Sequence, residues 1–124
     1  MTGNINMNGN SITGLAAPVD ASDAANKGYV DGVAVSLKSD INRAFKEISK
    51  TNGGVAIAMA MGGLTMPDSK TFAVNASLGF FQDQTAFAAQ AAVRVDPNWV
   101  VNGAIGFATE GGQIGGRLGI TAAW

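Results

Sequence analysis

The ionisable side chains are the first residues to consider for chemistry, and their types argue against an enzyme. The chain has no Cys and no His, so it lacks a thiolate nucleophile, a sulfur metal site and the commonest general base. The nine carboxylates are scattered, and none suggests a paired acid–base site. They are Asp20, Asp23, Asp31, Asp40, Glu47, Asp68, Asp83, Asp96 and Glu110. We therefore expect no catalytic residue, no metal and no cofactor.

The charge balance and the glycine-rich stretches exclude further kinds of site. Eight basic and nine acidic residues give a net charge of −1, too little basic character for sequence-specific nucleic-acid binding or for lipid head groups. Gly111-Gly112 and Gly115-Gly116 are expected in a turn and a strand, because no Lys followed by Ser or Thr completes a phosphate loop. Residues 55–64, the longest apolar stretch, are about half as long as a spanning helix. No leader peptide is expected at the N-terminus.

The N-terminal part of the chain divides into an arm and a long helix. Residues 1–19 are rich in Asn, Gly, Ser and Thr, and we expect an arm or a strand that needs partners. Residues 20–52 are predicted to form a stalk helix with Asp20 or Ser22 as its N-cap. Asn52-Gly53-Gly54 is expected to break or bend this helix.

One face of the stalk helix carries a heptad pattern. Apolar or small residues recur at steps of four and three, which predicts self-association through a seam. The seam residues are Val30, Ala34, Leu37, Ile41, Ala44 and Ile48. The pattern leaves open whether two or three helices associate, and one amphipathic helix on a globular core is the alternative.

Residues 53–70 are predicted to form a short helix followed by a linker. Residues 55–61 are apolar on every side, which predicts that they are buried all round. A buried strand is the alternative interpretation, because periodicity alone does not separate the two.

The strongest pattern lies in residues 71–124, where side chains alternate with a period of two. Turn-forming residues at 82–84, 96–98 and 110–112 divide this segment into four strands. Consecutive strands with short loops predict an antiparallel meander.

The two faces of these strands are both unsuited to water. One face is large and apolar with aromatic residues near the strand ends, and the other is small and carries two charges within the strands. An apolar outside, aromatic rims and a polar lumen are typical of an outer-membrane barrel. The predicted lipid-facing residues are Phe72, Val74, Leu78, Phe80, Phe87, Val93, Trp99, Ile105, Phe107, Leu118, Ile120 and Trp124. The predicted lumen residues are Gly79, Gln90, Arg94 and Arg117.

Four strands are too few to close a barrel, since even small barrels take about eight. Open edges are not tolerated in lipid, so we expect several copies to close one barrel, with residues 55–61 of each copy in its lumen. A soluble four-stranded sheet packed on its own helix is the alternative. For Arg94 and Arg117 we consider two roles: pairing with helix C-terminal carbonyls or lining a pore, or hydrogen bonding to Asn, Gln or water near the rim.

Several motifs follow one another in order between residues 53 and 124. They are the small-residue run Gly54-Val55-Ala56-Ile57-Ala58-Met59-Ala60-Met61-Gly62-Gly63-Leu64, then Pro67 and Lys70, then Gly79, then Gln84-Thr85-Ala86-Phe87-Ala88-Ala89-Gln90-Ala91-Ala92-Val93-Arg94, and finally Trp124. This order resembles the membrane-anchor domain of trimeric autotransporter adhesins, the YadA-like anchor. Gln90 departs from the family pattern, which has Gly near this position, and is expected to crowd the lumen and disturb helix packing there.

The resemblance implies a mainly β fold with a long α-helix. It implies a trimeric, twelve-stranded transmembrane β-barrel with four antiparallel strands per chain, whose lumen helices continue into a trimeric coiled coil. It also implies that the barrel exports and anchors a passenger, and that the terminal aromatic strand addresses the barrel-assembly machinery.

The N-terminal motifs resemble a different group of proteins. Residues 6–15 and the run Asp23-Ala24-Ala25-Asn26-Lys27-Gly28-Tyr29-Val30-Asp31 are similar to segments of phage tail fibres, although autotransporter necks have a related motif. From this we predict a homotrimeric phage tail tip, needle or fibre protein whose barrel inserts in or docks at the host outer membrane for DNA ejection. Its partners would be itself, outer-membrane lipid and other tail proteins. The alternatives are a bacterial autotransporter anchor that exports and tethers an adhesin, and a soluble trimeric shaft module.

Overall fold

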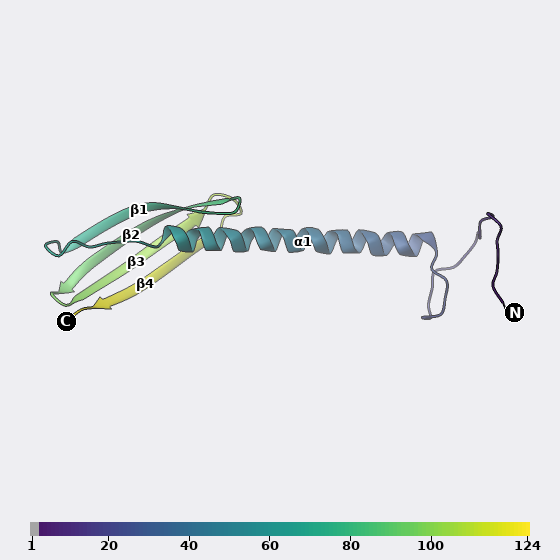
Figure 1. The fold of residues 1–124 in the computed structure, drawn as a ribbon, viewed down its shortest axis with the longest axis horizontal. Coiled ribbons are helices and arrows are strands. Elements are labelled where there is room, and N and C mark those ends of the chain that lie inside the picture. Colours follow the sequence, from purple (N-terminus) through teal and green to yellow (C-terminus); the bar gives the residue numbers. More distant parts are fainter. Residues whose placement is uncertain (1–2) are drawn as a thin grey trace. The chain divides into compact units, whose positions relative to one another are not determined.

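The computed structural model describes residues 3–124, which fall into two compact units that meet between Asn42 and Arg43. The described residues form one helix and four strands (Figure 1). The elements are α1 (Lys27–Ala60), β1 (Phe72–Phe81), β2 (Gln84–Asp96), β3 (Trp99–Ala108) and β4 (Ile114–Ala122). Among residues 3–124, no helix is both long enough and apolar enough to cross a bilayer.

Helix α1 begins later than the sequence predicts. Asn26 is the N-cap: its Oδ1 accepts the Tyr29 amide at 2.8 Å, and its Nδ2 donates to the Leu15 carbonyl at 2.9 Å. The expected caps Asp20 and Ser22 are therefore wrong, because both lie in the turn before the helix.

Asp23 organises that preceding turn. Its Oδ2 accepts the backbone amides of Val19 and Asp20, both at 2.9 Å. The hydrogen bond from the Asp20 amide, and then that from the Val19 amide, lower the pKa of the Asp23 carboxyl below its ordinary value. Residues 3–19 contain turns and bends but no strand.

In the second unit, the C-terminal part of α1 runs through the glycine pair without a break. The expectation that Asn52-Gly53-Gly54 interrupts the helix is wrong, because all three residues lie within α1. Gly53 lies where the helix passes close to the sheet. A Cβ at Gly53 would lie 2.6 Å from Gln113 Oε1 and 3.2 Å from Ala108 Cβ. Glycine lowers helix propensity by about 1 kcal/mol, but here it lets the helix approach the sheet closely.

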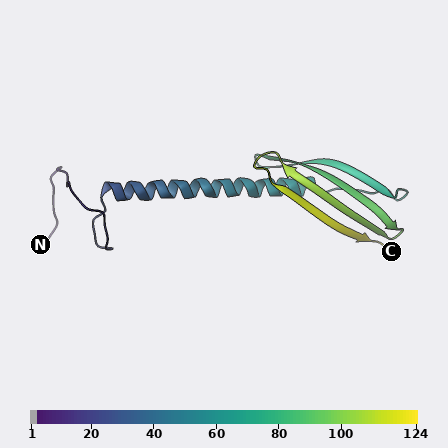
Figure 2. The same ribbon diagram turned by 180° about the vertical axis from the view of Figure 1, so that it is seen from behind.

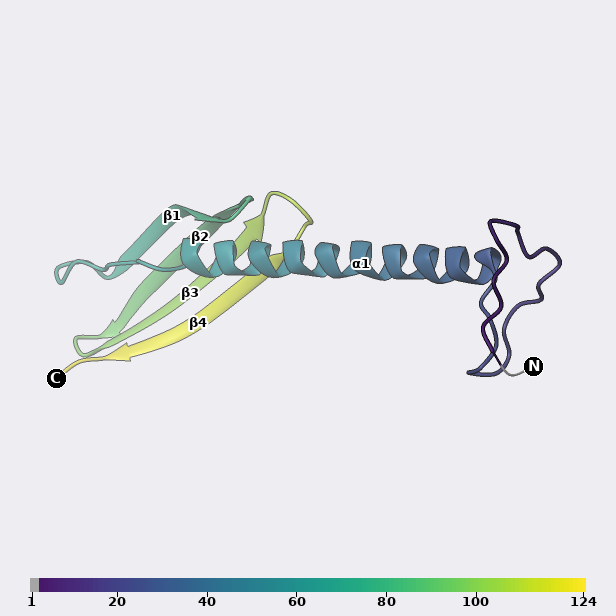
Figure 3. The same ribbon diagram turned by 45° about the vertical axis from the view of Figure 1, so that its right-hand side comes forward.

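The four strands form one antiparallel sheet in the order β1-β2-β3-β4, as the meander prediction requires. The register aligns residues in rows across the sheet. One row runs from Asn75 through Gln90 and Ala104 to Arg117. A shift in register interrupts the β2–β3 ladder near Asp96. The end of α1 crosses one face of the sheet, which we call the helix face (Figure 3). Seen from behind, the opposite face, which we call the outer face, is covered by no helix or strand of residues 43–124 (Figure 2).

Candidate functional site

The helix face is built for close contact with α1. A Cβ added to Gly79 in β1 would overlap the Ala56 carbonyl oxygen and lie 2.6 Å from the Ala60 amide nitrogen. The same addition at Gly106 in β3 or Gly115 in β4 would come within 2.8 or 2.9 Å of Ile57 Cγ2. Three strands therefore present glycine where the helix touches them: β1 packs against the helix backbone, and β3 and β4 make room for the Ile57 side chain.

The buried core of this unit is correspondingly small. Its buried members come from the helix and from the alanines of the helix face: Ala56, Ile57, Ala60, Met61, Ala86, Ala88 and Ala108. Residues 55–61 are buried on one side only, since Ala58 is exposed and Met59 is 55% exposed. The single chain thus leaves the other side of this apolar segment uncovered.

Two polar side chains close the C-terminal end of α1. The Ala60 carbonyl accepts hydrogen bonds from Ser77 Oγ and from Gln90 Nε2, the latter at 3.2 Å. Gln90 Nε2 also donates to Ser77 Oγ at 3.0 Å. The last carbonyls of a helix have no partners within the helix, so these donors satisfy one of them. We call Ser77 and Gln90 the helix-end pair.

Gln90 therefore does not disturb helix packing, contrary to the expectation from its departure from the family pattern. It is 4% exposed and reaches the helix end from β2. Its Oε1 is buried without a partner, as are Gln84 Oε1 and Gln113 Oε1. Each of these three glutamines lies beside the helix, and each leaves an acceptor that one chain does not satisfy.

Gln84 marks the other end of the helix contact. It is 1% exposed, and its Nε2 donates to Ser49 Oγ at 3.3 Å and to Glu110 Oε2 at 3.4 Å. Sequence reasoning missed Gln84 and Ser77 as site residues. The available signal was the alternation within each strand: Ser77 lies two residues before Gly79 in β1, and Gln84 lies two residues before Ala86 in β2, on the same small-residue face.

The two arginines of the helix face are not bound to the helix end in the single chain. Arg94 donates from Nε to the Lys70 carbonyl and from Nη1 to the Pro97 carbonyl, each at 3.3 Å. Arg117 donates from Nη2 to Asn102 Oδ1 at 3.4 Å. Arg117 therefore binds an Asn side chain, one of the predicted partners, whereas Arg94 binds two backbone carbonyls, which neither predicted role included.

The outer face exposes every large apolar side chain that it carries. All twelve residues predicted to face lipid lie here, with exposed fractions from 40% at Val93 to 103% at Trp124. Phe87 and Phe107 stack on neighbouring strands with ring centroids 5.6 Å apart. A continuous surface of large exposed apolar side chains is rare on soluble monomers and marks an interaction or membrane site.

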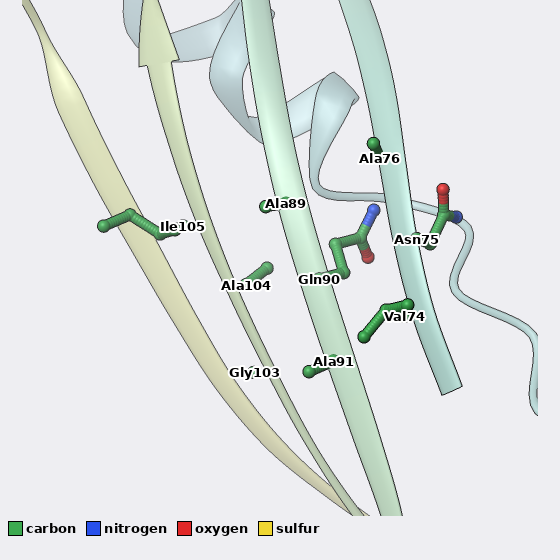
Figure 4. Close-up of a pocket in the computed structure, with 9 residues that line it drawn as sticks. All are labelled: Val74, Asn75, Ala76, Ala89, Gln90, Ala91, Gly103, Ala104 and Ile105. Carbon is green, nitrogen blue, oxygen red and sulfur yellow. The ribbon is translucent and has the colours of Figure 1, made fainter. Parts of the chain in front are cut away.

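The middle of the outer face is a shallow apolar hollow of about 610 Å³ (Figure 4). Small residues form its floor, and Val74 of β1 and Ile105 of β3 stand beside them. The hollow offers almost no polar atom to a ligand, and it is continuous with the rest of the outer face. Among residues 3–124, no group of three or more His, Cys, Asp or Glu is placed to hold a metal ion.

The predicted seam of α1 is also uncovered. Its four large members, Val30, Leu37, Ile41 and Ile48, are 53 to 56% exposed. Ala34 and Ala44 are exposed as well. Within residues 3–124, no strand pairs with the free edge of β1 or of β4. Residues 3–124 therefore leave the outer face, the helix seam and both edges of the sheet uncovered.

A sheet that turns its bulky apolar side outward and its glycines toward a helix has the design of a membrane anchor. Residues 64–124 match the model of the YadA-like membrane anchor domain, and this segment belongs to that family. The search of curated proteins found no match to the chain. The family match confirms the resemblance of the strand block to YadA-like anchors.

This match favours the second of the predicted functions over the first. A YadA-like anchor supports a bacterial autotransporter role and a bacterial outer-membrane location. It gives no support to a phage tail protein, a virion location or DNA ejection, which were the first prediction.

Proposed function

We propose that this chain is the anchor of a trimeric autotransporter, and that three copies form one β-barrel in the bacterial outer membrane. Three four-stranded sheets would supply twelve strands, enough to close a barrel. The free edge of β4 in each copy would pair with the free edge of β1 in the next, so that no backbone edge meets lipid.

The observation that carries this proposal is the exposure of the outer face. Large apolar residues cover it, and hydrocarbon is the medium in which such a face is stable. Phe72 and Trp99, at the starts of β1 and β3, lie at one rim of this face, and Phe80 and Phe107, near the ends of the same strands, lie at the other, in keeping with aromatic residues at the membrane interfaces.

The helix face then lines the lumen, and the three helix ends fill it. The uncovered side of residues 55–61, including Ala58 and Met59, would meet the same segments of the other two copies. The seam residues of α1 would continue this contact as a coiled coil beyond the barrel. Glycine on three strands of each copy leaves the space that three helices require.

In this arrangement the barrel exports and tethers a passenger joined to the N-terminal side of α1. The role is structural, with no reaction chemistry, no metal and no cofactor, and its partners are two further copies and outer-membrane lipid.

The test is the behaviour of the detergent-purified protein on SDS gels. We expect unboiled samples to run as a trimer and boiled samples as a monomer. Ile105→Arg should reduce the yield of trimer, because arginine in the middle of a lipid-facing strand costs about 2–4 kcal/mol. Asp83→Arg, in the turn between β1 and β2, is the matched control and should leave the trimer intact. A water-soluble monomer that tolerates Ile105→Arg would refute the proposal.

A further inference from the structure

The free edges of the sheet carry enough information to fix how neighbouring copies pair. We propose that β4 of one copy pairs with β1 of the next with a displacement of four residues along the strand, so that Thr121 lies opposite Asn75 of the next copy. This inference rests on the trimeric barrel proposed above and specifies its interface.

The first argument is the alternation of faces. Residues that lie directly opposite in a sheet point to the same side. Arg117 of β4 and Asn75 of β1 end the same row and both belong to the helix face. The next β1 strand must keep its helix face toward the lumen, so the displacement is an even number of residues.

The second argument is the position of the strand ends. Phe72 begins β1 and shares a row with Ile120, but β4 continues for two residues beyond it to Ala122. At the other end Ile114 begins β4 and shares a row with Leu78, but β1 continues for three residues beyond it to Phe81. From β1 to β4, which is three strand-to-strand steps, the ends of the strands are thus displaced by two to three residues along the strand direction.

One further step to the next copy extends this trend. If the strand ends of all copies lie level at the two rims, the same shift per strand gives about 3.3 residues over the four steps from β1 of one copy to β1 of the next. The nearest even number is four. A displacement of six would leave the rims out of line by almost three residues.

The third argument is the tilt of the strands. Four residues over four strands are about 3.3 Å of displacement per ~4.8 Å step, which corresponds to a tilt of about 35°. This lies within the range of about 35–45° of outer-membrane barrels. A displacement of two would give about 19°, far below that range.

Side-chain size fits the same pairing. The four-residue displacement places Arg117 opposite Gly79 of the next copy, which has no side chain of its own and lies directly against the last turn of its α1. A displacement of six would place it opposite Phe81, which already packs against the core of its own chain. On the outer face Gly116 comes opposite Phe80 of the next copy, a pairing in which an aromatic ring covers a glycine.

The pairing also gives Arg117 a role in the trimer. Gly79 is the point at which β1 touches the last turn of its own α1, which has no basic residue. Arg117 of the neighbouring copy would therefore lie beside the negative end of that helix dipole, where a cation is stabilising.

The native chain has no cysteine, so disulfide trapping tests the register directly. Asn75→Cys combined with Thr121→Cys should give a covalent trimer after oxidation, seen on boiled, non-reducing gels. Thr121→Cys with Ala73→Cys tests the displacement of two, and with Ser77→Cys the displacement of six. Each wrong pair is shifted by ~6.8 Å along the strand, so the predicted pair should cross-link about tenfold more.

Two further measurements keep the outcome unambiguous. Ala76→Cys with Ile120→Cys places the same register on the outer face and should also cross-link, away from the lumen. Unboiled gels of the cysteine-free parent report whether the trimer exists at all. A parent without a trimer refutes the proposed function, whereas a trimer that cross-links only through a wrong pair, or through neither predicted pair, refutes this register alone.

Discussion

Gly79→Ala introduces a methyl group at the closest contact between the sheet and the helix. The new Cβ would overlap the Ala56 carbonyl oxygen and lie 2.6 Å from the Ala60 amide nitrogen, whereas ordinary contacts begin at 3.4 Å. Both neighbours are backbone atoms, so no rotamer change relieves the overlap. The helix must move away by about 0.8 Å or more, and it then loses contacts along its length.

The magnitude follows from comparison with a matched substitution. Overpacking of this kind costs about 1–3 kcal/mol per chain, and three chains share it in the trimer. Replacing a strand glycine by alanine also gains about 0.5–1 kcal/mol. Gly103→Ala, on the outer face of β3 and away from the free edges of the sheet, has the same gain. The nearest neighbour of its Cβ, at 3.1 Å, is the end of the exposed Leu118 side chain, which can turn away.

The assay is the temperature at which half of the SDS-resistant trimer dissociates. We expect Gly79→Ala to lower this temperature by several degrees relative to Gly103→Ala, on the basis of about 1–3 kcal/mol per chain. Equal dissociation temperatures for the two variants would show that the helix does not press against β1 at Gly79.

Three further predictions concern the helix end, the seam and the turn before the helix. Ser77→Ala or Gln90→Leu alone should cost about 0.5–1.5 kcal/mol in trimer stability, and the double variant more than their sum, because the Ala60 carbonyl is then buried unpaired; an additive result would show that the two donors act separately. Ile41→Asp in the seam should lower trimer stability by at least about 2 kcal/mol, whereas Val35→Asp, outside the seam, should not; equal thermal denaturation of the two by circular dichroism would contradict a seam at this face. The turn that Asp23 holds should persist above the ordinary carboxyl pKa and be lost as pH falls through the lower pKa of the folded form; an NMR titration of Asp23 at or above the ordinary pKa would refute this.

The sequence was most informative where one physical cause governs a long stretch. The period-two alternation of residues 71–124 predicts strands with a bulky apolar face and a small-residue face, and the observed strands have these two faces. The same alternation separates Gly79 and Gln90 from the bulky outer residues. The number of copies in the barrel is a property of the assembly and stays a prediction.

The sequence was misleading where a tertiary contact overrides a local preference. Gly53 is a poor helix former, but the sheet needs its lack of a side chain, so the helix continues. Asp20 and Ser22 are good N-caps by type, but they lie in a turn that the Asp23 carboxylate holds, and Asn26 takes the cap. Neither the continuous helix at Gly53 nor the N-cap at Asn26 can be predicted from local sequence, because each depends on contacts with groups that only the fold brings together.

The helix-end pair was missed for a related reason. The family pattern has Gly near position 90, and this suggested crowding at Gln90. The helix C-terminal carbonyls were considered as partners of Arg94 and Arg117 and not of Ser77 and Gln90. Ser77 and Gln90 meet there only because the β1–β2 register brings them to the same helix carbonyl. A helix that ends against a sheet, together with polar residues on the facing side of the strands, predicts such a pair of donors.

The most direct test of this account is which face of the sheet touches lipid. Nitroxide labels at successive cysteines along β3, in the trimer reconstituted in vesicles, report contact with hydrocarbon through their collision rate with oxygen. We expect maxima at Trp99, Val101, Gly103, Ile105 and Phe107, and minima at the residues between them. Maxima at the alternate residues, or no periodicity at all, would contradict the placement of the outer face in the membrane.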